Sequence, residues 1–229
     1  MQISGFQKLT LLDYPGKVAC TVFTQSCNLR CPFCHNASLV VENTPPAMTE
    51  DELLAYLKKR VGVLEGVAIT GGEPTLNADL PELMAKIRAL GYSIKLDTNG
   101  TNPALLREIL KAGLAQRVAM DIKNAPELYE RTVGCKADME KISESKELLL
   151  SGVVDYEFRT TVVKGLHTKE SLIAAAQWIA GAKEYYLQQF KNSGNLILPE
   201  GLSEYTKEEM LALLDAVKEL VPQTKLRGI

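Results

Sequence analysis

Two kinds of hydrophobic pattern alternate along the chain. Short runs rich in β-branched and aromatic residues are each followed by a longer run whose apolar positions recur every three or four residues. The first pattern is typical of buried strands and the second of amphipathic helices. Their alternation favours parallel βα units. We therefore expect strands at residues 18–24, 67–70, 93–97, 118–122, 156–163 and 185–189.

Helix boundary signals lie between these expected strands. Thr49 and Glu52 match a capping box, and the apolar face that follows includes Leu53, Leu54 and Leu57. Glycines just after an apolar-periodic run are typical helix ends. Further helices are expected to begin near Asp79, after Pro103, after Asp138, near Leu172 and at Thr206, with Gly91, Gly113 and Gly152 ending the first three.

This rhythm of about six βα units runs without a Pro/Gly/Ser-rich linker, a close repeat or a low-complexity tract. A length of 229 residues is compatible with one domain, since repeated α/β folds often exceed the usual domain size. We therefore expect a single α/β domain. In such a fold the functional residues gather where the carboxyl ends of the parallel strands meet.

The overall charge and composition narrow the classes of function. The formal net charge is −2 and there is no basic run, which argues against nucleic acid or a membrane surface as partner. The N-terminus lacks the apolar segment of a signal peptide, and charges interrupt every apolar stretch before it reaches membrane-spanning length. We expect a cytoplasmic protein. In that reducing compartment, the five cysteines indicate metal or redox chemistry more than disulfides.

Three of these cysteines form a compact loop directly after the first expected strand. Cys27, Cys31 and Cys34 follow a Cys-x3-Cys-x2-Cys pattern. Three thiolates at this spacing can hold one side of a 4Fe–4S cluster and leave its fourth iron without a protein ligand. An open coordination site is what a catalytic metal centre requires.

Three other interpretations of this loop stay open. His35 could complete a Cys3His zinc site, although adjacent Cys34 and His35 would strain to bind one ion. Cys31 and Cys34 alone could form a redox dithiol, which leaves Cys27 without a role. All three could be structural cysteines of the core, but the polar residues between them do not resemble a core.

Polar motifs follow the next three expected strands. Residues 70–74 (Thr-Gly-Gly-Glu-Pro) combine a flexible backbone with a carboxylate suited to an ammonium group, although Gly-Gly-Glu by itself is usually a turn. Residues 96–100 (Leu-Asp-Thr-Asn-Gly) contain an Asn-Gly pair typical of turns. In residues 120–123 (Met-Asp-Ile-Lys), the carboxylate of an apolar strand needs a partner or a ligand.

The cysteine pattern, with the aromatic Phe33 before its last cysteine, resembles the radical S-adenosylmethionine (SAM) superfamily, and the resemblance extends over most of the chain. It implies a partial (β/α)6 TIM-like barrel of parallel strands. Residues 1–229 would then form a radical SAM core domain with a short N-terminal extension and a C-terminal helix. It also implies a catalytic 4Fe–4S cluster on Cys27, Cys31 and Cys34, with S-adenosyl-L-methionine bound to the open iron. In that superfamily an electron from the cluster breaks the cofactor to give a 5′-deoxyadenosyl radical.

Within the superfamily, Cys34-His35-Asn36 and the strand-end motifs resemble the activases of glycyl-radical enzymes. By this resemblance Phe33 contacts the adenine, Glu73 the amino group and Lys123 the carboxylate of the cofactor. The implied cofactor contacts in full are Phe33, His35, Asn36, Gly71, Gly72, Glu73, Asp97, Thr98, Asp121 and Lys123. A monovalent-cation site beside the cofactor carboxylate is implied at Asp97, Thr98, Met120 and Asp121.

Residues 13–17 (Asp-Tyr-Pro-Gly-Lys) resemble the segment with which activases grip the substrate peptide, together with an arginine that matches Arg159. Asp13 and Arg159 are therefore expected at the substrate peptide. Tyr14 and Lys17 depart from the family pattern, and Lys cannot offer the bidentate fork of Arg.

Other departures leave the cluster ligands intact. Ser26 stands where the family has Gly, and residues 187–190 (Leu-Gln-Gln-Phe) replace a segment in which some activases carry a histidine. There is no second group of clustered cysteines. Cys20 and Cys135 are interpreted as a small core residue and an incidental thiol.

Residues 4–17, the Leu-Gln-Gln-Phe segment and the terminal Arg-Gly-Ile resemble one group in particular, the activating protein of anaerobic ribonucleoside-triphosphate reductase in its longer form. This implies an oxidoreductase that generates a glycyl radical on that reductase and receives electrons from a flavodoxin or ferredoxin type donor. Three alternatives stay open: an activase of another glycyl-radical enzyme such as pyruvate formate-lyase, a radical enzyme acting on a small molecule, and a zinc-stapled interaction domain.

Overall fold

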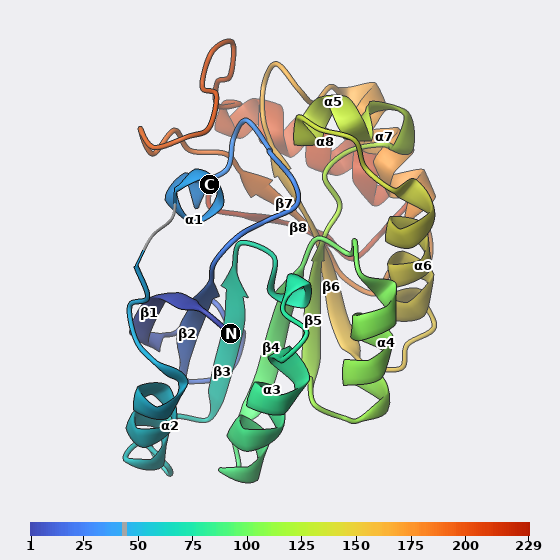
Figure 1. The fold of residues 1–229 in the computed structure, drawn as a ribbon. Helices are drawn as coiled ribbons and strands as arrows, with labels where there is room; N and C mark the ends of the chain where they lie inside the picture. Colours follow the sequence, from blue (N-terminus) through green and yellow to red (C-terminus); the bar gives the residue numbers. More distant parts are fainter. Residues whose placement is uncertain (43–44) are drawn as a thin grey trace.

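The computed structural model describes residues 1–42 and 45–229. Its centre is a sheet of eight strands that lie side by side in chain order (Figure 1). Neighbouring strands are parallel except for β1, which runs antiparallel to β2. The strands are β1 (Ile3–Thr10), β2 (Ala19–Thr24), β3 (Gly66–Gly71), β4 (Ser93–Thr98), β5 (Arg117–Asp121), β6 (Asp155–Val162), β7 (Tyr185–Gln189) and β8 (Thr224–Arg227).

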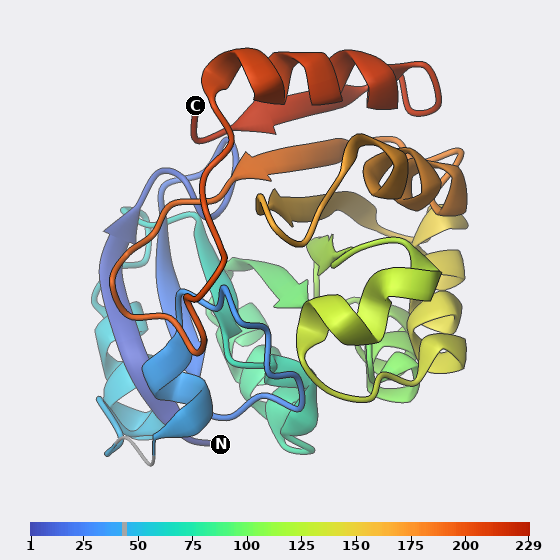
Figure 2. The same cartoon turned by 90° about the horizontal axis from the view of Figure 1, so that it is seen from above.

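Helices connect the parallel strands and pack along the outside of the sheet, as crossover connections require. Seen from above, the sheet curves into an open barrel with most helices on its convex side (Figure 2). Two short helices, α1 and α5, lie at the end toward which the parallel strands point (Figure 1). The helices are α1 (Ala37–Val41), α2 (Glu50–Lys58), α3 (Leu80–Ala89), α4 (Pro103–Lys111), α5 (Tyr129–Val133), α6 (Met139–Leu150), α7 (Lys169–Trp178) and α8 (Lys207–Lys218), with 3-10 turns η1 (Pro74–Leu76) and η2 (Pro126–Leu128).

The expected α/β fold, a partial TIM-like barrel, is confirmed, and each of the six expected strands is present to within one residue at either end. The expectation of six strands is wrong in number, because β1 and β8 extend the sheet at its two edges. Neither edge strand has an apolar run. β8 is four residues long with two charged side chains, so its pairing with β7 rather than its composition makes it a strand.

The helix starts follow their capping signals. Thr49 and Glu52 form the expected capping box on α2, and Thr206 forms one with Glu209 on α8. Leu53 and Leu57 are buried under α2 as expected, whereas Leu54 is only half-buried. These caps hold the first turns of the two helices, so the crossovers begin at defined residues.

Side chains alternate between the two faces of each strand, and this alternation determines the chemistry of the barrel interior. Ile94 and Leu96 of β4 are fully buried in the hydrophobic core, while Lys95 and Asp97, which alternate with them, pair with each other. On β6, Glu157 and Arg159 likewise alternate with apolar neighbours. The inner face therefore carries charged residues from several strands, and the apolar core lies between sheet and helices.

One ion-pair network ties β5, β6 and β8 together. The carboxylate of Glu157 is fully buried and accepts hydrogen bonds from Arg117 and Arg227, each at 2.9 Å. Burial by itself raises the pKa of Glu157, but the two guanidinium groups outweigh it and hold this pKa at about 2. Arg227 also lies over the ring of Tyr186, 3.8 Å from its centroid. The last strand is thus anchored by charge as well as by backbone pairing.

No helix in the described part of the chain has the length and apolar character needed to cross a membrane.

Candidate cofactor-binding site

A cavity of about 250 Å³ opens where the parallel strands end. This is the end of the barrel at which the sequence motifs were expected to meet. The wall is formed by the cysteine loop on one side and by the ends of β3 to β7 on the other. The lining residues are Cys27, Leu29, Cys31, Phe33, Cys34, His35, Asn36, Thr70, Gly71, Gly72, Glu73, Asp97, Thr98, Asn99, Asp121, Lys123, Arg159, Thr161 and Gln188.

All three cysteines of the loop line this cavity. Within residues 1–42 and 45–229, no three His, Cys, Asp or Glu side chains converge closely enough to hold a single metal ion. Three thiols at one cavity could hold one side of a 4Fe–4S cluster.

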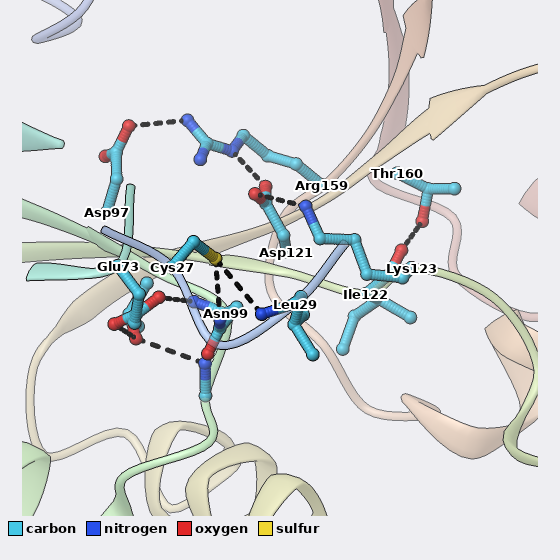
Figure 3. A network of polar contacts seen from close by, with 12 residues as sticks. Cys27, Leu29, Glu73, Asp97, Asn99, Asp121, Ile122, Lys123, Arg159 and Thr160 are labelled. Atoms are coloured by element: carbon cyan, nitrogen blue, oxygen red, sulfur yellow. Dashed lines mark hydrogen bonds and ion pairs between the residues drawn. The ribbon is translucent and has the colours of Figure 1, made fainter. Parts of the chain in front are cut away.

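The thiols are held in a partly desolvated setting. Burial raises the pKa of Cys27 to about 11 and that of Cys31 to about 12, and it also raises the pKa of Cys34. Cys27 accepts hydrogen bonds from the backbone N–H of Leu29 at 3.4 Å and from Asn99 Nδ2 at 3.8 Å (Figure 3). Such N–H···S contacts stabilise a thiolate and tune the potential of an iron–sulfur centre.

Close backbone contacts hold the cysteine loop against the Gly-Gly-Glu turn. The N–H of Glu73 donates to the carbonyl of Ser26 at 2.8 Å. A Cβ atom on Gly72 would lie 1.8 Å from that same carbonyl oxygen, so only glycine allows the approach. Asn36 Nδ2 adds a hydrogen bond to the carbonyl of Gly71 at 2.9 Å. Residues 71–73 therefore position the cysteine loop, besides any contact they make with a cofactor.

Glu73 is 1% exposed and accepts four hydrogen bonds from the protein. Its Oε1 accepts from the N–H and hydroxyl of Thr75 and, at 2.7 Å, from the hydroxyl of Thr98; its Oε2 accepts from the N–H of Asn99 at 2.6 Å. Burial raises the pKa of Glu73 despite these bonds. Among the described residues, no Lys or Arg side chain forms an ion pair with it. Glu73 is thus a buried carboxylate without a counter-cation at the cavity wall, the setting in which a ligand ammonium group binds.

On the other side of the cavity the charges alternate from strand to strand. Lys95 pairs with Asp97. Arg159 bridges Asp97 and Asp121 with two bonds of 2.9 Å (Figure 3). Lys123 completes the chain by donating to Asp121 at 3.0 Å. Burial opposes ionisation, but Arg159 and Lys123 hold the pKa of Asp121 down at about 2. Of these groups, Asp97, Asp121, Lys123 and Arg159 line the cavity, so the ammonium of Lys123 and the guanidinium of Arg159 are available there to an anionic group.

Phe33 and His35 of the loop pack against the segments that follow β6 and β7. Phe33 is buried, and its ring meets the edge of the His167 ring at 6.3 Å between centroids. His35 Nε2 lies 2.7 Å from the carbonyl of Lys191, and its ring stacks on Phe190 at 5.7 Å. The segment after β7 therefore contacts the cysteine loop through His35 and helps to hold it in place.

Sequence reasoning missed the role of His167. Its Nδ1 accepts from the N–H of Val163 at 3.1 Å, so the proton sits on Nε2, which donates to the carbonyl of Lys123 at 2.7 Å. Burial lowers the pKa of His167, so the ring stays neutral at neutral pH. His167 therefore links the backbone carbonyl of Lys123 to the ring of Phe33. His167 is far along the chain from both residues, so no local sequence pattern indicates these contacts.

Asn99 was also missed as a site residue, because its Asn-Gly pair reads as a turn. In the structure its Nδ2 donates to Asn28 Oδ1 at 3.0 Å as well as to Cys27, and its N–H binds Glu73. A polar residue directly after a parallel strand was the available signal. Asn99 links the cysteine loop to both neighbouring strand ends.

Two expected site residues do not line the cavity. Asp13 lies in the loop between β1 and β2, where the hydroxyl of Thr21 donates to it at 2.5 Å. The side chain of Met120 is fully buried in the hydrophobic core, against Gly100, on the face of β5 away from Asp121. Cys20 is buried within β2, and the Cys135 thiol donates to the carbonyl of Asn28 at 3.6 Å.

A family model described as the radical SAM superfamily matches residues 21–179. A protein of Methanocaldococcus jannaschii, named as a glycyl-radical enzyme activating enzyme, is 32% identical over 194 residues, which cover 82% of this chain and 80% of that protein. A Thermococcus kodakarensis protein named as a GTP 3′,8-cyclase is 33% identical over 152 residues, covering 64% of this chain and 48% of its own length.

Solved structures share the fold at low sequence identity. Streptococcus suis SuiB superposes with a TM-score of 0.70 at 17% identity, over 91% of this chain and 48% of its own. A domain of a pyruvate-formate lyase-activating enzyme from Bacteroides vulgatus gives a TM-score of 0.59 at 14% identity, over 72% of this chain and 99% of its own. These likenesses support the fold alone. With the family match over residues 21–179 and three cysteines around one cavity, the chain belongs to the radical SAM superfamily.

Proposed function

We propose that this protein is a glycyl-radical-enzyme activase that binds a 4Fe–4S cluster through Cys27, Cys31 and Cys34 and cleaves S-adenosylmethionine reductively. The observation that carries the proposal is the polarity of the cavity. A buried carboxylate without a counter-cation, Glu73, lies on one side, and the cationic groups of Lys123 and Arg159 lie on the other. The amine and carboxylate of a methionyl group match these two sides.

When bound, the cluster and cofactor supply a one-electron cleavage. With one electron from the donor, that chemistry would yield methionine, 5′-deoxyadenosine and a glycyl radical on the partner protein. The chain's own task is orientation and exclusion of water. Phe33 offers an apolar ring for the adenine, and Lys123 offers an ammonium for the carboxylate. A primary radical is indiscriminate, so such positioning must hold the target glycine close.

The activase assignment draws its support from the Methanocaldococcus jannaschii relative, which resembles this chain over most of both lengths. A protein partner needs access to the cavity, and in the described part of the chain the sheet does not close between its end strands β1 and β8. We propose anaerobic ribonucleoside-triphosphate reductase as the partner and a flavodoxin or ferredoxin type protein as the electron donor. We also propose a cytoplasmic location for the reaction.

Anaerobic reconstitution with iron and sulfide, followed by electron paramagnetic resonance, tests this proposal. The reconstituted protein, S-adenosylmethionine, a one-electron reductant and the reductase should yield the doublet of a glycyl radical together with 5′-deoxyadenosine. A doublet with pyruvate formate-lyase instead would keep the chemistry and change the partner. A colourless protein that binds only zinc would overturn the proposal.

A second candidate is a radical SAM enzyme acting on a small molecule. It is favoured by the similarity to a protein named as a GTP 3′,8-cyclase, although that protein is about twice as long as the matched segment. Cleavage of S-adenosylmethionine without a doublet in any glycyl-radical protein, coupled to consumption of a nucleotide, would favour this second function.

A further inference from the structure

The residues implied as a monovalent-cation site are already engaged with one another and with the chain. Asp97 binds Lys95 through Oδ1 and Arg159 through Oδ2. Asp121 binds Arg159 through Oδ1 and Lys123 through Oδ2. Each of the four carboxylate oxygens therefore has a cationic donor.

The remaining implied ligands, Thr98 and Met120, add little to such a site. The Thr98 hydroxyl donates to Glu73 at 2.7 Å and accepts from the N–H of Gly100 at 3.1 Å. Met120 has no side-chain oxygen, and its thioether is buried in the hydrophobic core, which leaves only its backbone carbonyl as a ligand. A hard cation requires several oxygen ligands at once. The donor set at this end of the cavity does not fit such an ion.

The charges of this cluster also argue against an additional bound cation. Lys95, Lys123 and Arg159 carry three positive charges against the two carboxylates. A ligand carboxylate arriving at Lys123 would be the third anion of this cluster, so that each of the three anions would have a cation of the chain. Charges are poorly screened in such a buried site, so an additional cation would meet these three at close range.

Lys95 is the residue that makes this arrangement possible. It lies in the middle of β4, and its side chain is 2% exposed. Its stem is fixed by burial, and its ammonium group points along the inner face to Asp97, two residues further along the strand. A charge held in this way stays in the site at any salt composition, whereas a bound ion exchanges with solvent.

We propose that Lys95 and Arg159 act as built-in counter-cations, so that this protein positions the cofactor carboxylate without a bound monovalent cation. Lys95 is then a positioning residue, acting on the cofactor through Asp97 and Arg159. The inference rests on the proposed function only in taking S-adenosylmethionine as the ligand, and no glycyl-radical partner enters it.

The test compares cofactor binding and reductive cleavage in potassium, sodium and tetramethylammonium salts at one ionic strength, with equilibrium dialysis for binding. The unmodified protein should bind S-adenosylmethionine equally well, within about twofold, in all three salts. The variant Lys95→Met should bind about tenfold more weakly in tetramethylammonium and recover in potassium or sodium, since the ion can then replace the lost charge. Lys95→Arg should keep the salt independence.

A second readout does not involve the cofactor. Thermal unfolding of the cluster-free protein should give the same midpoint in potassium and tetramethylammonium, whereas Lys95→Met should unfold at a higher temperature in potassium. Lys86→Met, which removes a lysine from an exposed ion pair with Glu50, is the matched control and should respond to neither salt. A tenfold loss of binding by the unmodified protein in tetramethylammonium would overturn the proposal. So would a Lys95→Met variant that binds the cofactor normally in every salt.

Discussion

Replacing Glu73 by glutamine separates the structural role of this residue from its role toward a ligand. The amide oxygen of glutamine can take the place of Oε1 and keep the three bonds from Thr75 and Thr98. The amide nitrogen then faces the N–H of Asn99, which loses its acceptor. In the opposite orientation the N–H of Thr75 loses its acceptor instead, while the two hydroxyls can rotate to accept from the amide, so either orientation leaves one buried N–H unpaired.

The magnitude follows from that count. One buried N–H without an acceptor costs about 1 to 3 kcal/mol, so the free energy of unfolding of Glu73→Gln should fall by that amount in urea titrations. Binding is a separate quantity. Loss of the carboxylate charge should weaken the binding of S-adenosylmethionine by about 1 to 3 kcal/mol, or about 5- to 150-fold in Kd, because the ammonium group loses a charge-assisted bond.

Thr75→Val is the matched control. It removes one hydroxyl donor to Glu73 but keeps the charge and the backbone N–H bond, in a position that is equally buried. It should therefore lose about 1 kcal/mol of stability while binding the cofactor as the unmodified protein does. If Glu73→Gln binds the cofactor as tightly as Thr75→Val, the assignment of Glu73 to the ammonium group is refuted and its role is structural only.

Three further predictions follow from single residues. Ser26 adopts a left-handed backbone conformation with φ of 69°, so Ser26→Gly should raise the free energy of unfolding by about 0.5 to 1 kcal/mol in urea titrations; an unchanged or lower value would contradict this. The folded-state pKa of Glu157 is depressed from 4.5 to about 2, which corresponds to about 3 kcal/mol. That stability is present above pH 4.5 and lost as the pH falls toward 2, so unfolding of Glu157→Gln followed against pH should lack this drop. Cys31→Ala should abolish the visible absorption of the cluster and cofactor cleavage, whereas Cys135→Ser should retain both.

Much of the site was predictable because its signals are local. The spacing of Cys27, Cys31 and Cys34 lies within one loop, and each polar motif directly follows an apolar run. Once the apolar runs are interpreted as parallel strands, the strand ends must meet at one edge, which brings Glu73 and Asp121 to the cysteine loop. The cavity lining agrees with that expectation, apart from Asp13 and the side chain of Met120.

Residues whose role depends on a distant partner were not predictable in this way. His167 acts on Phe33 and on the backbone of Lys123, and nothing in its own neighbourhood along the chain indicates either contact. β8 is a strand only because β7 offers an edge to pair with. Lys95 gave a faint signal, as a lysine in a buried strand must have a partner, but the partner itself was not evident.

The sequence by itself determined the order of strands and helices, the ligand spacing of the cysteine loop and the edge at which the polar motifs gather. These depend on periodicity and on neighbours along the chain. Only the tertiary structure determines which charged side chains pair with one another. Arg159 reaches across to Asp97 and Asp121 on two other strands, and Glu73 is surrounded by donors without a cation. Coulombic pairing depends on distances between strands, and those distances exist only once the sheet has formed.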